Sequence, residues 1–323
     1  MRRVEYQNAH DLYWTQASNA SFDASDLSLG FVNYMSQSLS TTGGRQKIEL
    51  GEQRLIGSTE WLNEARSFDA ARVDSGQWYA WGGRLGVANT KPETARMGAV
   101  THADKAWGTT SLILKHDLGT ASDIDIQTLD HFVKVKFGST SVAAEGAAQY
   151  GSNNGKDQRA WAYHVAVTQD LIEKTTLSIE TDAASGGGNS TTIRTFDNLY
   201  PSNHNLYDLA DLAGWKNLNH LGARLENHSF NNLTLRASGH AFSLRDDSDA
   251  WYSATGTKIL ADPTGASGGD IGKELDLEAL YTLNHVGIFS AGIAFFEPGN
   301  FVQNISGHSN QETFGYIQFQ TRF

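Results

Sequence analysis

The stretch Gly43–Val73, GGRQKIELGEQRLIGSTEWLNEARSFDAARV, carries the most distinctive pattern in the chain. It begins with alternation, in which Ile48 and Leu50 are apolar and the residues around them are charged. The charged positions are Arg45, Lys47 and Glu49. Because successive side chains of a strand point to opposite faces, the pattern predicts a strand with one apolar and one charged face.

The rest of this stretch predicts a loop and a second strand. Gly51 and Gly57 interrupt the alternation, a loop with Trp61 follows, and an arginine-bearing strand runs over Arg66–Val73. Strands with one charged and one apolar face suit a soluble, half-buried sheet. They suit equally well a barrel wall with lipid outside and a polar lumen inside.

Composition narrows the class of protein. The chain has 323 residues, no cysteine, 32 glycines, 4 prolines and a net charge of −11. The absence of cysteine excludes a disulfide scaffold and thiolate metal sites. The acidic balance argues against nucleic acid as a partner, since a phosphate-binding surface needs basic excess. Abundant glycine and aromatic residues favour many strands and turns over helices.

Neither a membrane helix nor a secretion signal is visible. The longest apolar run, Gly287–Phe296, ends at Glu297 and is far shorter than the roughly 18 residues that a membrane helix needs. The opening MRRVEYQNAHDLYW has basic residues but no apolar core after them. An outer-membrane location therefore predicts that a signal peptide lies outside this sequence.

Alternation recurs along almost the whole chain. It is clearest over His131–Phe137 and Trp161–Val167, and we count about 14 to 16 candidate strands. Their connections alternate between tight turns and long polar loops, which is typical of outer-membrane barrels. The long loops are expected at Lys91–Lys105, Phe196–Trp215 and Asp246–Gly272.

These patterns predict a transmembrane antiparallel up-and-down β-barrel, as a single domain over residues 1–323. The last strand, FGYIQFQTRF, alternates to a terminal Phe323, as outer-membrane barrels do. A soluble β-sandwich is the alternative, but its buried faces would be more uniformly aliphatic. The barrel assigns four aromatic side chains to the lipid face: Tyr79, Trp81, Trp161 and Tyr163.

Several motifs resemble one family, the alginate export family of outer-membrane porins. They are Gly44–Gln46, Leu50–Gly51, Gln53–Gly57, Trp61, Arg66–Asp69, Phe196–Asp197, Leu199–Pro201, Asp211–Leu212, Gly214–Trp215, Asp249–Tyr252, Gly256, Gly272–Asp276 and Phe295–Gly299. The resemblance implies an eighteen-stranded barrel with a signal peptide. It places Val4–Ala9 as the third strand, so the signal and about two strands are expected to be missing from this sequence.

The resemblance also implies an anionic polysaccharide as cargo. A pore for a chain of carboxylates needs rings of cations, with acidic residues that prevent overly tight binding. The expected pore-lining residues are Arg45, Lys47, Arg54, Arg66, Arg84, Arg224, Arg236, Glu49, Glu274 and Asp276. By parity, Lys134, Lys136, Arg322, Glu145, Glu226 and Glu278 share the polar side. The alternative is that these charges pair off as a structural network.

No catalytic or metal motif is found in the sequence. The 11 histidines show no HxxxH or HxH pair joined to a carboxylate, and no GxSxG elbow or phosphate loop is present. We therefore expect neither an enzyme nor a cofactor or metal. The expected partners are outer-membrane lipid, an anionic polysaccharide or acidic solute, and periplasmic export proteins.

The function expected is passive flow through a channel in the bacterial outer membrane. A porin for another acidic or neutral solute is one alternative, because family likeness does not fix cargo. A soluble β-rich binding protein or a barrel enzyme is the alternative from another class.

Overall fold

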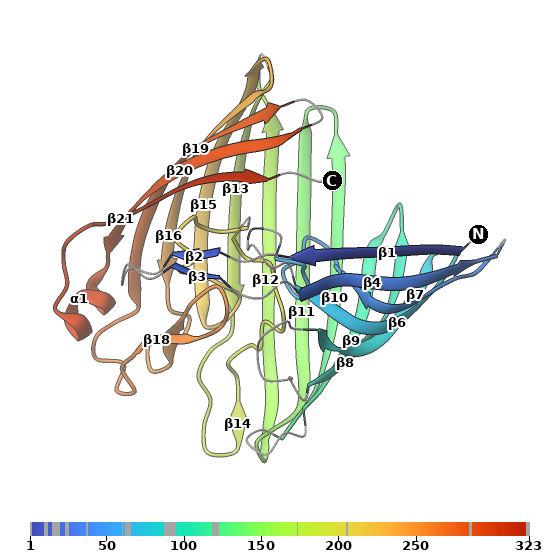
Figure 1. The fold of residues 1–323 in the computed structure, drawn as a ribbon. Coiled ribbons are helices and arrows are strands. Elements are labelled where there is room, and N and C mark those ends of the chain that lie inside the picture. Colours follow the sequence, from blue (N-terminus) through green and yellow to red (C-terminus); the bar gives the residue numbers. More distant parts are fainter. Residues whose placement is uncertain are drawn as a thin grey trace.

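The computed structural model describes residues 2–9, 12–14, 20–22, 26–36, 38–59, 61, 66–86, 95–117, 123–172, 174–204, 206–283 and 286–320. Within these residues the regular secondary structure is strand apart from one short helix, α1 (Figure 1). The elements are β1 (Arg2–Ala9), β2 (Leu12–Trp14), β3 (Ala20–Phe22), β4 (Asp26–Met35), β5 (Ser40–Gln46), β6 (Ser67–Ser75), β7 (Trp78–Gly86), β8 (Arg96–Asp104), β9 (Gly108–Asp117), β10 (Ile124–Phe137), β11 (Thr140–Asn153), β12 (Lys156–Asp170), β13 (Thr175–Ala184), β14 (Thr192–Ile193), β15 (Leu218–Phe230), β16 (Leu233–Ser243), β17 (Ala250–Tyr252), β18 (Lys258–Ala261), β19 (Asp270–Leu283), β20 (Gly287–Pro298), α1 (Asn300–Ser306) and β21 (Glu312–Gln320).

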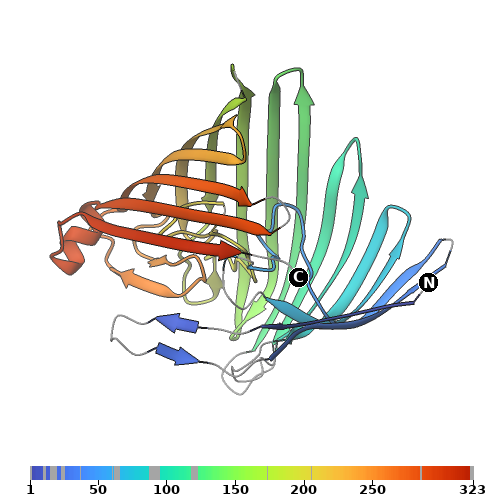
Figure 2. The same cartoon turned by 45° about the horizontal axis from the view of Figure 1, so that its top comes forward.

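One large sheet dominates the described part of the chain. It has 17 strands, of which the two-residue β14 is a parallel addition to β12. The other strands pair antiparallel with their neighbours, from β1 and β4 through β13 and β15 to β20 and β21. Figure 2 shows the sheet curving strongly around the loops that lie inside it. Without β14 the sheet has 16 strands, the upper end of the range of 14 to 16 predicted from the alternation.

The two faces of the sheet differ as the sequence predicts. On β12, Trp161, Tyr163 and Val165 are exposed on the outer face, while His164 and the alanines beside it are buried on the inner face. On β19, Leu275 and Leu277 point outward and Glu274 and Asp276 inward. An apolar belt outside and polar groups inside is the pattern of a barrel that crosses a bilayer.

Strand connections differ between the two ends of the sheet. At one end they are tight, as at Phe137–Thr140 and Phe230–Leu233. At the other end most are long, including residues 47–66, 185–217 and 244–269. β11 and β12 are the exception, because a tight turn joins Asn153 to Lys156 at the long-loop end. Among the described residues, no helix is long and apolar enough to cross a membrane.

Gly44 shows why glycine stands inside a strand of the quoted stretch. Its φ is +125°, and a Cβ there would lie 2.4 Å from the carbonyl oxygen of Gly30 on β4. A side chain at this position would therefore force β4 and β5 apart.

Several expectations about the wall were wrong. Residues 96–104, expected in a loop, form β8. The first strand of the quoted stretch ends at Gln46. Ile48 and Leu50 therefore lie in the connection after this strand, where both side chains are buried. Trp81 and Tyr79, both expected to face lipid, lie on the inner face, where Trp81 is buried against Phe68. Ile48, Leu50 and Trp81 share one physical reason: they belong to an apolar core inside the curved sheet.

Candidate functional site

Two segments fill the interior of the curved sheet: residues 47–61, here the first inner segment, and residues 185–217, here the second inner segment. They bind each other through backbone hydrogen bonds from Gly57 N–H to the Tyr200 carbonyl and from Tyr200 N–H to the Leu55 carbonyl, each 2.9 Å. Arg66 clamps the junction, donating to the carbonyls of Tyr200 at 2.6 Å and Pro201 at 2.7 Å. The interior is therefore occupied by an ordered plug rather than left open.

The first inner segment is also anchored to the last strand. The ring of Trp61 stacks on His204, with centroids 3.7 Å apart, and meets Tyr316 edge-on. Gln318 of β21 donates to the Trp61 carbonyl at 3.0 Å. The segment thus spans the interior from β5 to β21.

Arg54 lies at the centre of the plug and is only 2% exposed. Its guanidinium donates to Asp182 Oδ1 at 3.1 Å and to His164 Nε2 at 3.1 Å. The rings of Tyr207 and Trp215, from the second inner segment, lie 5.4 and 5.7 Å from its Cζ. A buried cation between aromatic faces and a carboxylate ties both segments to β12 and β13.

Asp182 is the acceptor at which the plug and the sheet meet. Besides Arg54, it accepts from Trp215 Nε1 at 3.1 Å and from His220 at 2.9 Å. The second inner segment is held further along by Leu209, whose N–H donates to Glu274 at 3.1 Å. Three of the predicted charged residues, Arg54, Arg66 and Glu274, therefore hold the plug in place.

A basic cavity of about 600 Å³ opens at the long-loop end of the sheet. Among the described residues, its charged lining consists of three cations and one carboxylate: Arg66, Lys115, Lys216 and Asp197. Tyr200 and Tyr252 line it as well, with Lys115 Nζ 5.5 Å from the first ring and Lys216 Nζ 4.6 Å from the second. The cavity combines positive charge with aromatic faces.

The charge states in this cavity follow from its contacts. Burial would raise the pKa of Asp197, but Lys115 Nζ at 2.8 Å more than offsets burial, so the pKa lies below its ordinary value and the group is ionised. Burial lowers the pKa of Lys216 below its ordinary value, although Asp197 opposes the shift. Near neutral pH the cavity carries a net positive charge.

Two smaller cavities lie at the tight-turn end, beyond Arg54. One of about 330 Å³ is lined by Arg54, Lys134, Glu180 and Arg224, and one of about 180 Å³ by Arg224, Arg236 and Asp276. The Arg54 cluster thus separates the basic cavity from a second, mixed-charge region.

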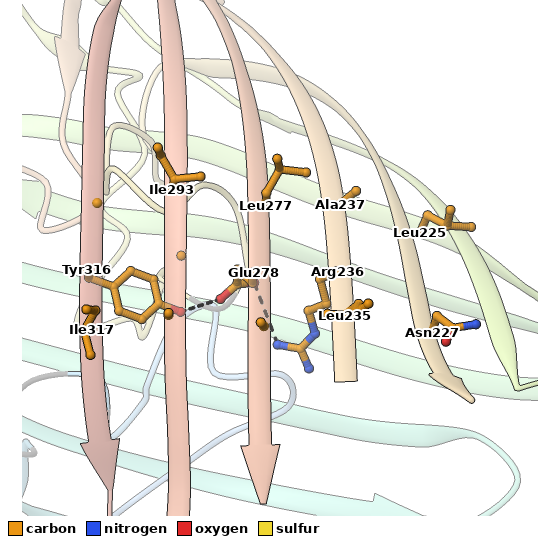
Figure 3. Close-up of a pocket in the computed structure, with 14 residues that line it drawn as sticks. Leu225, Asn227, Leu235, Arg236, Ala237, Leu277, Glu278, Ile293, Tyr316 and Ile317 are labelled. Atoms are coloured by element: carbon orange, nitrogen blue, oxygen red, sulfur yellow. Dashed lines mark hydrogen bonds and ion pairs between the residues drawn. The ribbon is translucent and has the colours of Figure 1, made fainter. Parts of the chain in front are cut away.

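A larger cavity of about 1000 Å³ lies along β15, β16, β19, β20 and β21, where several of the lining residues are alanine or glycine (Figure 3). Most of its lining, including Leu225, Leu277 and Ile293, belongs to the outer apolar face. On the inner side Tyr316 donates to Glu278 at 2.7 Å. Its size reflects the outer apolar surface and not the charged interior.

Most predicted site residues lie in the interior. Arg54 lies in the first inner segment and Arg66 at the junction of the two inner segments. The predicted residues at inward positions of the sheet are Arg224, Arg236, Glu274 and Asp276. Lys47 and Glu49 lie in the first inner segment, where Ser58 donates a hydrogen bond to Glu49. Arg322 lies outside the described residues.

Arg45 and Arg84 are placed differently from the other predicted residues. Both flank Asp69, with Arg45 Nε at 2.7 Å and Arg84 Nε at 3.6 Å from its carboxylate. This row shares the outer face with Val73, and Arg84 is 62% exposed. Near these arginines the inner face of β6 and β7 is apolar, with Phe68 packed on Trp81, although Arg72 lies on the same face nearer the tight-turn end. The parity argument is therefore reversed for Arg45 and Arg84.

Sequence reasoning did not select several interior residues. Lys115 was visible as a charge alternating with Leu112 and Leu114, and that signal could have placed it. Lys216 follows a loop without periodicity and had no such signal. Asp182 meets His220 through the pairing of β13 with β15, which the sequence alone does not reveal.

A curved antiparallel sheet with an apolar exterior and a charged, loop-filled interior defines a β-barrel porin of the bacterial outer membrane. The chain belongs to the alginate export family, whose model matches residues 2–92 and 89–316. A comparison with curated proteins finds no match.

Solved outer-membrane porins of Pseudomonas aeruginosa share the fold. OccD3 (OpdP) has a TM-score of 0.60 at 13% identity, covering 91% of this chain and 78% of its own. OccK5 (OpdH) has a TM-score of 0.60 at 12% identity, covering 94% and 84%. OccK10 (OpdN) has a TM-score of 0.58 at 11% identity, covering 100% and 99%. At such identities the likeness concerns the fold alone.

Proposed function

We propose that this porin is a passive channel for uronates, either as free acidic sugars or as an anionic polysaccharide such as alginate. The observation that carries the proposal is the basic cavity, where three cations face one carboxylate. A low-dielectric wall strengthens the attraction of such a cluster for a carboxylate ligand. The aromatic faces of Tyr200 and Tyr252 suit the apolar side of a sugar ring.

Two comparisons support this cargo. The family is named for alginate export, and alginate is a polymer of uronates. The similar porin OccK2 (OpdF), with a TM-score of 0.57 at 12% identity, was solved in complex with glucuronate. We propose no catalytic step and no energy source, so flow follows the concentration gradient.

The proposed path runs from the basic cavity past the Arg54 cluster to Arg224 and Arg236. Asp276 and Glu278 line the last part of this path and keep a polyanion from binding too tightly to leave. Glu274 is buried and instead accepts the Leu209 N–H. Lys47 and Glu49 belong to the segment that narrows it. Because Arg45 and Arg84 lie on the outer face, they are not part of the proposed lining.

The charge of the basic cavity makes the proposal testable. The double variant Lys115→Gln/Lys216→Gln removes two of three cations, so we expect anion selectivity to fall severalfold and the on-rate of glucuronate block to fall by about tenfold. Asp197→Asn should change selectivity in the opposite direction. Reversal potentials in planar bilayers under a salt gradient measure both effects.

Lys273→Gln is the matched control, because Lys273 pairs with Ala241 on the outer face and should leave selectivity unchanged. A cation-selective wild-type channel would contradict the proposed cargo. So would a selectivity that responds equally to the cavity variants and to Lys273→Gln.

Selectivity should also depend on pH. Since burial lowers the pKa of Lys216, this side chain loses its proton before an ordinary lysine as pH rises. As pH rises, anion selectivity should therefore begin to decline at a lower pH than the ordinary lysine pKa of about 10.4 would give. Lys216→Arg keeps the charge, so its decline should move to higher pH. Identical pH curves for the two proteins would refute the assignment.

A further inference from the structure

A row of histidines and carboxylates crosses the inner face of β13, β15, β16 and β19, apart from the basic cavity. His220 Nδ1 lies 2.9 Å from Asp182 Oδ2, and His220 Nε2 lies 2.9 Å from His240 Nδ1. His240 Nε2 lies 3.5 Å from Asp276 Oδ2. Two imidazoles are thus held between two carboxylates.

Glu180 completes a set of three possible ligands. One ligand atom each from Glu180, His220 and His240 lies within 4.8 Å of the other two. Glu180 and His240 sit opposite Gly222 in consecutive strand pairs, so the three side chains surround one point on the inner face. Two imidazoles and a carboxylate form a donor set typical of divalent transition-metal ions such as Zn²⁺.

The hydrogen bonds of His220 and His240 favour an ion between these two imidazoles and Glu180. Asp182 accepts from His220 Nδ1–H, so His220 Nε2 carries a lone pair and His240 Nδ1 must donate to it. His240 Nε2 is then without its proton. Within the described residues it is buried with no hydrogen-bond partner, on a side chain that is 1% exposed.

A metal ion resolves this arrangement. Both facing nitrogens would bind the ion through lone pairs, and His240 Nε2 would carry a proton directed at Asp276. Each imidazole would then have a carboxylate behind it, which is the usual outer partner of a metal-bound histidine. The dication would also offset the negative charge of Glu180 and Asp182.

Gly222 leaves the space that the ion needs. A Cβ at this position would lie 3.0 Å from His220 Nε2 and 3.1 Å from Glu180 Cγ. The site also has access to solvent, because the side chain of Glu180 is 18% exposed and lines the cavity of about 330 Å³. An ion could enter there without opening the sheet.

The neighbouring group of His164, Glu180 and Asp182 is a weaker candidate. His164 accepts from Arg54 at Nε2 and donates to Asp182 from Nδ1, so both of its nitrogens are engaged. A cation there would also face the Arg54 guanidinium directly.

We propose that Glu180, His220 and His240 form a divalent transition-metal site of the zinc type inside the barrel, which cross-links β13, β15 and β16. The site is independent of the cargo proposed above, and nothing in that proposal depends on it.

Metal binding to the refolded, tag-free protein in detergent tests this site. After treatment with a chelator, calorimetric titration with Zn²⁺ should show one ion per chain. Titration with Co²⁺ should give the visible absorption of a low-coordinate cobalt site, and Zn²⁺ should displace it. Glu180→Gln and Gly222→Ala should each weaken binding by at least about tenfold, and His240→Gln should abolish it.

His228→Gln is the matched control, since His228 lies on β15 but is exposed and bonded to Glu226 and Thr234. Heat-dependent gel mobility confirms that each variant is folded. If His240→Gln does not fold, Glu180→Gln and Gly222→Ala decide the matter. Wild-type protein that takes up no ion overturns the proposal, as does uptake that these variants leave unchanged.

Discussion

Replacing Arg54 with methionine should destabilise the folded barrel by about 3–5 kcal/mol, the usual cost of removing one partner of a buried ion pair. Methionine fills a similar volume but leaves Asp182 buried without its cation. It also leaves Glu145, whose Oε2 lies 3.9 Å from Arg54 Nε, without its counter-charge. Urea unfolding followed by tryptophan fluorescence measures the loss.

Arg159→Met provides the comparison, because Arg159 pairs with Asp157 at the surface and both side chains are more than 60% exposed. Exposed pairs contribute about 0–1 kcal/mol. The double variant Arg54→Met/Asp182→Asn should recover part of the loss, since it removes the uncompensated charge as well. Equal urea midpoints for Arg54→Met and Arg159→Met would show that the ion pairs of Arg54 with Asp182 and Glu145 contribute no more to stability than an exposed pair.

The sequence predicted the wall of the barrel better than its contents. Along β12 and β19 alternation assigned each side chain to the correct face, because lipid outside and polar groups inside impose a strict period of two. At β7 the same rule failed, because Trp81 packs on Phe68 of β6, whose ring meets Tyr200 of the second inner segment. Alternation along a strand separates its side chains into two faces. It shows which face points inward only where the inward face is polar.

For the charged residues of the interior, the sequence predicted some members but not their partners. Arg54 and Arg66 were selected from the quoted stretch although glycines obscured their parity, and both lie inside. Their partners could not be predicted, because Arg54 meets Asp182 and Arg66 meets Tyr200 across more than a hundred residues of chain. The histidine row needs the register of β15 with β16, and no local spacing encodes it.

Replacing residues 199–213 with a flexible Gly–Ser linker of equal length should raise single-channel conductance severalfold. This segment supplies Tyr207 over Arg54 and Leu209 beside Glu274, so its removal takes away the central contacts of the plug. A barrel with about 16 strands is wide enough to hold an aqueous channel once its interior is clear. Planar-bilayer recording measures the change, and the basic cavity keeps Arg66 and Lys115 in the variant.

Two further variants show whether the plug itself limits flow. A Gly–Ser replacement of residues 262–268, an exposed turn in which Asp262 binds Thr264 and Ser267, should leave conductance unchanged.

Arg66→Gln removes the contacts to the Tyr200 and Pro201 carbonyls and should give frequent brief openings of intermediate size. Because the inner segments bind each other at this junction, loosening it frees one end of the plug while the wall stays intact. A folded 199–213 variant with wild-type conductance would place the narrowest point elsewhere, at the wall residues Arg224 and Arg236.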